Sequence, residues 1–193
     1  MNTKPRLAVS IGDPNGIGPE VTFKMLLALD LSLSTPIISA PHLLFQRLIK
    51  EQNHFNSGTI YPTPTIHYIS DHKQVVEGAI NVLESFKSWS ELEFSSCNYG
   101  QITALAGEIS MQSVLTGIQL CLNKHAHALV TAPISKESIQ LAGYKVPGHT
   151  EYLMEQTGVE DVVMMLSGRG LNICLLTTHL PLKSVAVSYT HLT

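Results

Sequence analysis

The chain has 193 residues, of which 44% are hydrophobic and only 14% are charged, and its formal net charge is −3. This length is enough to bury a sizeable core, and the sequence lacks the lysine and arginine clusters with which a nucleic-acid-binding protein neutralises phosphates. No stretch approaches the roughly 20 apolar residues that cross a membrane, so we expect a cytoplasmic protein with neither a membrane nor a nucleic acid as partner.

The cysteines and the low charge add two expectations. Cys97, Cys121 and Cys174 are far apart and form no C-x-x-C pair, so we expect reduced, buried thiols rather than a disulfide framework or a zinc ribbon. The charged fraction lies well below the roughly 25% of an average soluble domain, which indicates a subunit or domain interface.

Strand and helix patterns alternate along the chain, which predicts an α/β fold with a mostly parallel sheet and flanking helices. The stretch 70–104 has no clear period, and no element is predicted there. In the first part of the chain the apolar patterns predict strands at 6–11, 35–40 and near 65–69, and helices from Pro19 and over 42–52.

The second part of the chain has clearer patterns. Apolar residues at helical spacing predict an amphipathic helix within 107–125, and an apolar run predicts a buried strand at 127–133. The remaining elements are two short helices at 135–142 and 150–157, and two strands at 161–167 and 171–178 that Gly-Arg-Gly joins as a hairpin.

The first segment that could carry chemistry is "IGDPNGIGPE", a glycine-rich turn between a strand and a helix. Such a turn can present backbone N–H groups to an anion. Val21 stands where the dinucleotide fingerprint needs its third glycine, and the turn lacks the Gly-Lys-Ser/Thr of a phosphate-binding P-loop. A structural turn and a ligand loop both fit the pattern.

Two later segments place polar groups at the start of a helix. "TAPISKES" follows a predicted strand. Ligands bind beyond the carboxyl ends of strands in open α/β sheets. Lys136 therefore either binds a phosphate or carboxylate, or is an ordinary exposed lysine. In "PGHTEYL" we expect Thr150 to be the N-cap and Glu151 to suit the helix dipole. His149 and Thr150 either bind an anion or serve only the local structure.

A fourth segment, "CLLTTHLPL", places His179 directly after an apolar strand. A single histidine does not make a metal site, because zinc typically needs at least three protein ligands. From the residues alone, His179 is either structural or one ligand of a larger set.

Five segments in this order, "GDPNGIGPE", "TAPISK", "GHTEYL", "VVMML" and "TTHLPL", resemble the 4-hydroxythreonine-4-phosphate dehydrogenase family of vitamin B6 biosynthesis. The resemblance implies an architecture like that of the isocitrate and isopropylmalate dehydrogenases, and a homodimer in the full-length form. It also implies NAD(P)-dependent, metal-assisted oxidation and decarboxylation of 4-hydroxythreonine 4-phosphate, a small phosphorylated hydroxy amino acid, to 3-amino-2-oxopropyl phosphate in pyridoxal phosphate biosynthesis.

The resemblance also implies roles for particular residues. His149 and Thr150 are expected to contact the substrate, and His179 to bind a divalent metal: zinc first, with magnesium or cobalt as alternatives. The cofactor is NAD or NADP. No catalytic or cofactor-binding residue is assigned. Ser135 departs from the asparagine or histidine more usual before Lys136, which leaves the narrow substrate open.

The resemblance covers little more than the first half of such proteins. We expect residues 1–185 to be the N-terminal portion of a two-domain dehydrogenase with its C-terminal part missing, and residues 186–193 to be a truncation or junction that does not match the family. Because the absent part would carry two more metal histidines, we expect this chain to be inactive alone. Two alternatives stay open: a related dehydrogenase of phosphorylated sugar acids of the threonate or erythronate type, and an inactive phosphate-binding fragment.

Overall fold

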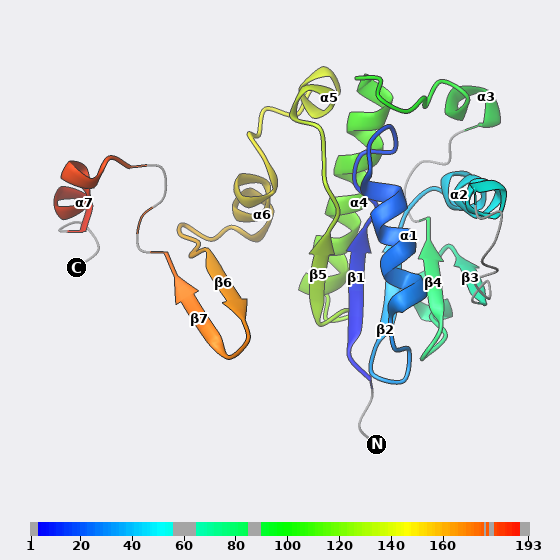
Figure 1. The fold of residues 1–193 in the computed structure, drawn as a ribbon, viewed down its shortest axis with the longest axis horizontal. Helices are drawn as coiled ribbons and strands as arrows, with labels where there is room; N and C mark the ends of the chain where they lie inside the picture. The colour runs from blue at the N-terminus through cyan, green and yellow to red at the C-terminus, as the bar shows by residue number, and fades with distance from the viewer. Residues whose placement is uncertain (1–3, 56–64, 85–89, 176, 178–179, 190–193) are drawn as a thin grey trace. The chain divides into compact units, whose positions relative to one another are not determined.

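The computed structural model describes residues 4–55, 65–84, 90–175, 177 and 180–189. The chain divides into two units, Met1–Thr157 and Gly158–Thr193. The first unit alternates strands and helices, as predicted (Figure 1). Its strands are β1 (Arg6–Ser10), β2 (Thr35–Ser39), β3 (Ile66–Ile69), β4 (Ile80–Leu83) and β5 (Ala128–Thr131). Its helices are α1 (Gly18–Ala28), α2 (His42–Phe55), the 3-10 turn η1 (His72–Gln74), α3 (Glu91–Phe94), α4 (Ala104–Leu122), α5 (Lys136–Leu141) and α6 (His149–Thr157).

The five strands form one sheet in the order β3-β4-β2-β1-β5, and every neighbouring pair is parallel. Val9 of β1 lies opposite Ile38 of β2 on one side and Val130 of β5 on the other. The predicted parallel sheet with flanking helices is therefore confirmed. Because all strands run the same way, the segments that follow them lie at the same edge of the sheet.

Helices cover both faces of this sheet (Figure 1). On one face, Phe23 of α1 and Phe45 of α2 pack with apolar side chains of β1, β2 and β4. On the other face, Leu120 of α4 packs with Ile37 and Leu83. This two-sided cover is what a parallel sheet needs, since both of its faces are apolar.

The strand β4 was not predicted, although it lies between β2 and β3. Its sequence is Ile-Asn-Val-Leu, and the fully buried Asn81 interrupts the apolar run. The Asn81 side chain accepts from the N–H of Val76 at 2.9 Å and donates to the carbonyl oxygens of Val76 and Ala79 at 3.1 and 2.9 Å. Asn81 therefore stabilises the turn before the strand. Because this polar residue interrupts the apolar run, the sequence pattern does not predict a buried strand here.

The strand β5 lies where it was predicted, but the prediction that it is buried is wrong. Ala128 and Thr131 are exposed, and the side chain of Val130 is 40% exposed. The reason is its place at the edge of the sheet, next to β1 alone. A run of apolar residues does not distinguish an edge strand from a central one.

The second unit contains the hairpin of β6 (Met165–Gly168) and β7 (Leu171–Cys174), and the helix α7 (Leu182–Tyr189). The predicted hairpin is confirmed, since the strands pair antiparallel. Arg169 and Gly170 both have positive φ, 47° and 82°, as a tight two-residue hairpin turn requires. A domain boundary at residue 185 stays a prediction.

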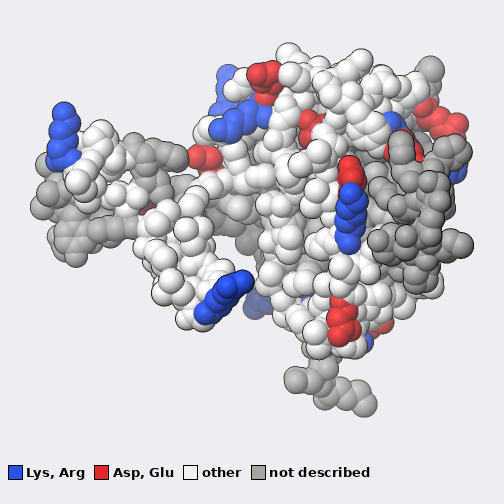
Figure 2. Space-filling view, in the orientation of Figure 1, with Lys and Arg blue, Asp and Glu red and all other residues white. Residues whose placement is uncertain are grey.

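Three further observations concern the surface and the cysteines. Charged side chains lie scattered on the face drawn in Figure 2, and no described helix is long and apolar enough to span a membrane. The cysteines are free, but Cys97 is buried while Cys174 is exposed, so the expectation of uniformly buried thiols is wrong.

Replacement of Asn81 by leucine should destabilise the first unit. The change leaves the N–H of Val76 without its acceptor, which should lower the free energy of unfolding by about 1–3 kcal/mol in urea denaturation. The exposed Asn98, whose amide makes one 3.4 Å hydrogen bond to Ser96, provides the matched control, and Asn98→Leu should change stability by less than about 0.5 kcal/mol. Equal costs for the two variants would contradict this account of β4.

Candidate functional site

Two of the segments singled out in the sequence meet beyond the carboxyl end of β5. They line an open cavity of about 440 Å³. One wall comes from the segment between β5 and α5, and the other from the start of α6. The lining residues are Pro133, Ile134, Lys136, Pro147, Gly148, His149, Thr150 and Glu151. The structure thus brings Lys136 of α5 together with His149 and Thr150 of α6.

Lys136 is the first residue of α5. The Oγ of Ser135 caps this helix by accepting from the N–H of Ser138 at 3.2 Å. The Lys136 side chain is exposed and forms no ion pair with any residue that the structure describes. Its ammonium group is therefore free to bind an anion in the cavity.

The helix α6 begins at His149, so the prediction that Thr150 is its N-cap is wrong. Gly148 precedes the first helical residue, and its carbonyl oxygen accepts from the N–H of Tyr152 at 3.3 Å. Thr150 lies within the first turn and is exposed, so its hydroxyl is available to a ligand. The buried Tyr152 anchors this turn against Tyr144, with ring centroids 6.1 Å apart.

His149 is half-buried, and its Nε2 atom is buried without a hydrogen-bond partner among the described residues. Burial lowers the pKa of this imidazole below its ordinary value, because desolvation disfavours the charged form. A buried polar nitrogen without a partner is costly, and His149 is one of the residues that line the cavity.

The glycine-rich loop after β1 contributes no lining residue to this cavity. It supports the wall instead. The N–H of Asp13 donates to the carbonyl oxygen of Pro133 at 2.9 Å. Gly12 has a φ of +73°, and a Cβ there would lie 2.3 Å from the same oxygen; a Cβ on Gly18 would lie 3.2 Å from it. These glycines permit the close approach of the two segments, and this favours the structural reading of the loop.

Asp13 is the residue of this loop whose importance the sequence did not reveal. Its side chain is 7% exposed. Burial raises the pKa of the carboxyl group above its ordinary value, and hydrogen bonds from Asn15 and Ser138 offset part of that rise. The signal in the sequence was an acidic residue directly after a strand and a glycine, but its partner Ser138 lies 125 positions away.

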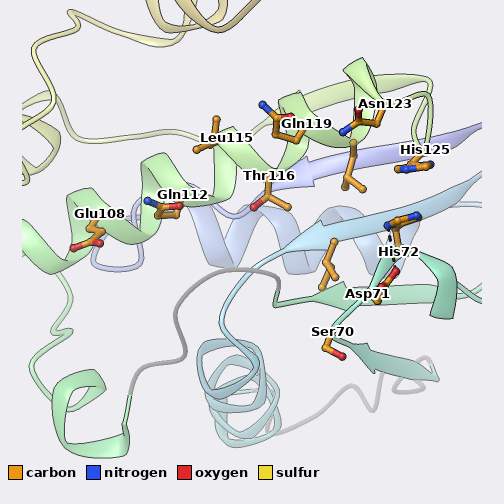
Figure 3. Close-up of a pocket in the computed structure, with 12 residues that line it drawn as sticks. Ser70, Asp71, His72, Glu108, Gln112, Leu115, Thr116, Gln119, Asn123 and His125 are labelled. Atoms are coloured by element: carbon orange, nitrogen blue, oxygen red, sulfur yellow. Dashed lines mark ion pairs between the residues drawn. The ribbon is translucent and has the colours of Figure 1, made fainter.

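A second, larger cavity of about 550 Å³ lies elsewhere in the first unit, beside α4 and η1 (Figure 3). The rings of His72 and His125 stack on its rim with centroids 3.7 Å apart, and Asp71 Oδ1 lies 3.2 Å from His72 Nδ1. None of the lining residues belongs to the segments singled out in the sequence. The smaller cavity is therefore the better candidate, because the Lys136 ammonium has no ion-pair partner and the His149 Nε2 atom no hydrogen-bond partner among the described residues. Its lining residues also come from two of those segments.

The predicted metal ligand His179 lies outside the described residues. Among the residues that the structure does describe, no group of three or more His, Cys, Asp or Glu side chains could hold a metal ion. The assignment of His179 stays a prediction.

Comparison with known proteins gives the context for this geometry. A protein 33% identical to this chain over 185 residues is the 4-hydroxythreonine-4-phosphate dehydrogenase of Geobacter metallireducens, with 95% of this chain and 52% of the relative covered. A candidate D-threonate 4-phosphate dehydrogenase of Halalkalibacterium halodurans is 30% identical, with 95% and 52% covered. The crystal structure of the Klebsiella pneumoniae 4-hydroxythreonine-4-phosphate dehydrogenase superposes with a TM-score of 0.77 at 27% identity, over 95% of this chain and 53% of that one.

The chain thus spans about half the length of the curated relatives it matches. The model of one protein family, described as pyridoxal phosphate biosynthetic protein PdxA, matches residues 34–191. That range includes both walls of the candidate cavity. The chain therefore belongs to the PdxA family of pyridoxal phosphate biosynthetic proteins.

Proposed function

We propose that this chain is the phosphate-binding portion of a 4-hydroxythreonine-4-phosphate dehydrogenase, and that the phosphate of the substrate binds between Lys136, His149 and Thr150. The observation that carries the proposal is the convergence of these three side chains on one cavity at the carboxyl end of β5. The names of the relatives support the substrate class.

Each of the three residues would act differently on the phosphate. The ammonium of Lys136 would supply a point charge. The neutral ring of His149 would donate a hydrogen bond from its unpartnered Nε2, and Thr150 would donate from its hydroxyl. The first N–H groups of α6 add donors, because the N-terminus of a helix favours an anion.

Glu151 bears on the choice between two substrate classes. Its carboxylate lines the same cavity and repels phosphate oxygens, but it would attract the ammonium group of a phosphorylated amino acid. A phosphorylated sugar acid of the threonate type lacks that ammonium. The relative from Halalkalibacterium halodurans supports the sugar acid as the second candidate, whereas Glu151 favours the amino acid.

The remaining parts of the reaction extend beyond the residues that the structure describes. The family resemblance supports NAD or NADP as oxidant, zinc or another divalent ion with His179 among its ligands, and a cytoplasmic homodimer as the full-length form. Such an ion polarises the substrate oxygen when bound. Because the described residues offer no three-ligand cluster, no step of the proposal depends on a metal ion.

Loss of the Lys136 charge should weaken phosphate binding. Lys136→Met should raise the Kd for 4-hydroxythreonine 4-phosphate about tenfold or more in calorimetric titration, because a hydrogen bond to a charged group contributes about 1.5–3 kcal/mol. Lys145→Met is the matched control, since Lys145 is an exposed lysine of the same region that does not line the cavity. Unchanged affinity in Lys136→Met, or an equal loss in both variants, would contradict the site.

We expect this chain to bind the phosphorylated substrate without oxidising it. Titration should show binding of the phosphorylated substrate, while absorbance at the NADH wavelength should show no reduction of NAD or NADP with zinc, magnesium or cobalt present. The reason is that the family resemblance implies two further metal histidines in the part of the relatives that this chain does not cover. Turnover by the 193-residue chain at the rate of a full-length relative would refute this division.

The stability of the first unit should depend on the protonation of His149. Its pKa is lowered from 6.5 by burial, so the unfolded chain binds more protons below that pH and the folded state loses stability as the pH falls. His149→Gln removes this contribution. The unfolding free energy of wild type minus that of the variant should therefore fall as the pH is lowered from about 7 to about 5 in urea titrations. A difference that is constant with pH would show that the ring is not buried as a neutral group.

A further inference from the structure

The side chain of Asp13 bridges two segments that are far apart in the sequence. Its Oδ1 accepts from the N–H of Asn15 at 2.8 Å, within its own loop. Its Oδ2 lies 3.4 Å from the Oγ of Ser138, which donates to it from α5. Together with the backbone hydrogen bond from Asp13 to Pro133 at 2.9 Å, the residue contacts both ends of the segment that carries Lys136.

The Ser138 end of this bridge is tightly enclosed. Ser138 is fully buried, and its N–H donates to the Oγ of Ser135 at 3.2 Å. A Cβ added at Gly107 of α4 would lie 2.0 Å from the carbonyl oxygen of Ser138. The first turn of α5 is therefore held between α4 on one side and the Asp13 carboxylate on another.

Lys136 lies between these two fixed points. Its own side chain is exposed and has no ion-pair partner among the described residues, so the backbone of the segment 133–138, rather than an ion pair, places it. The position of the ammonium group in the cavity thus depends on contacts made by residues on either side of it.

We propose that Asp13 is a positioning residue for the anion cavity: by holding Pro133 and Ser138 together it keeps the first turn of α5, and with it Lys136, in place to bind a phosphate. This inference rests on the proposed function for the identity of the ligand. The bridge itself is independent of that ligand.

The burial of the carboxylate supports a role of this kind. An aspartate that is 7% exposed and takes part in no ion pair among the described residues costs free energy in the folded state. Its hydrogen bonds offset part of that cost. A group that is costly for stability and lies behind the wall of a ligand cavity is typical of residues that serve the site.

Amide hydrogen exchange of the unliganded chain tests the bridge directly. In Asp13→Ala, the amides of Ser138 and Ile139, which donate to the Oγ and the carbonyl oxygen of Ser135, should exchange about tenfold or more faster than in wild type, while those of β2 and α2 stay protected. Asp13→Asn should restore slow exchange to within about twofold, because its amide oxygen accepts from Asn15 and its amide nitrogen donates to the hydroxyl oxygen of Ser138. Asp30→Ala is the matched control. Asp30 Oδ1 accepts from the N–H of Ser32, two residues on, at 2.8 Å, and Asp30 lies far from this segment in the sequence.

Binding of inorganic phosphate and of 4-hydroxythreonine 4-phosphate to the same variants completes the test. Asp13→Ala should weaken both about fivefold or more, and Asp13→Asn and Asp30→Ala should bind as wild type does. Wild-type exchange at residues 138 and 139 in Asp13→Ala overturns the proposal, and so does faster exchange without weaker binding. If Asp13→Ala does not fold, Ser138→Ala decides in its place: faster exchange at residues 138 and 139 supports the bridge, and unchanged exchange overturns it. If wild type binds neither probe, the proposed function and the link to the ligand both fail, while the exchange results still report on the bridge.

Discussion

The contact between the loop after β1 and the segment after β5 is the constraint on which the candidate site depends. At that point the carbonyl oxygen of Pro133 accepts from Asp13 and lies so near Gly12 that any side chain there would collide with it. The two strands are neighbours in the sheet, so their following segments must either diverge or pack closely. Here they pack closely, and the glycines make this possible. The glycine-rich loop therefore serves the cavity from behind, although no residue of the loop lines it.

Much of the fold could be predicted from the sequence because it follows local patterns. The alternation of strand and helix, the long helix α4 and the hairpin turn at Arg169 and Gly170 each depend on residues close together in the chain. The failures share one physical cause. β4 was missed because the partners of Asn81 are backbone groups that only the folded turn presents. The exposure of β5 depends on its position at the edge of the sheet, and a local sequence pattern does not indicate the order of the strands.

Some residues of the candidate site could likewise be predicted from the sequence and others could not. Lys136, His149 and Thr150 could be selected from their places at helix starts after strand and turn signals, and the structure places all three on one cavity. The role of Asp13 could not be predicted, because its contacts with Pro133 and Ser138 span more than half of the chain. Nor did the sequence predict that α6 begins at His149, one residue before the threonine expected to cap it. For Asp13 the missing information is a tertiary contact, whereas the start of α6 is marked by a local hydrogen bond from the N–H of Tyr152 to the carbonyl oxygen of Gly148.

The most direct test of the candidate site is a crystal structure of this chain with 4-hydroxythreonine 4-phosphate bound. The phosphate should lie within hydrogen-bond distance of the Lys136 ammonium, the His149 Nε2 atom and the Thr150 hydroxyl, with the segment 133–138 unmoved against the glycine-rich loop. Phosphate density beside His72 and His125 in the larger cavity, or on the N–H groups of the loop 11–17, would contradict it.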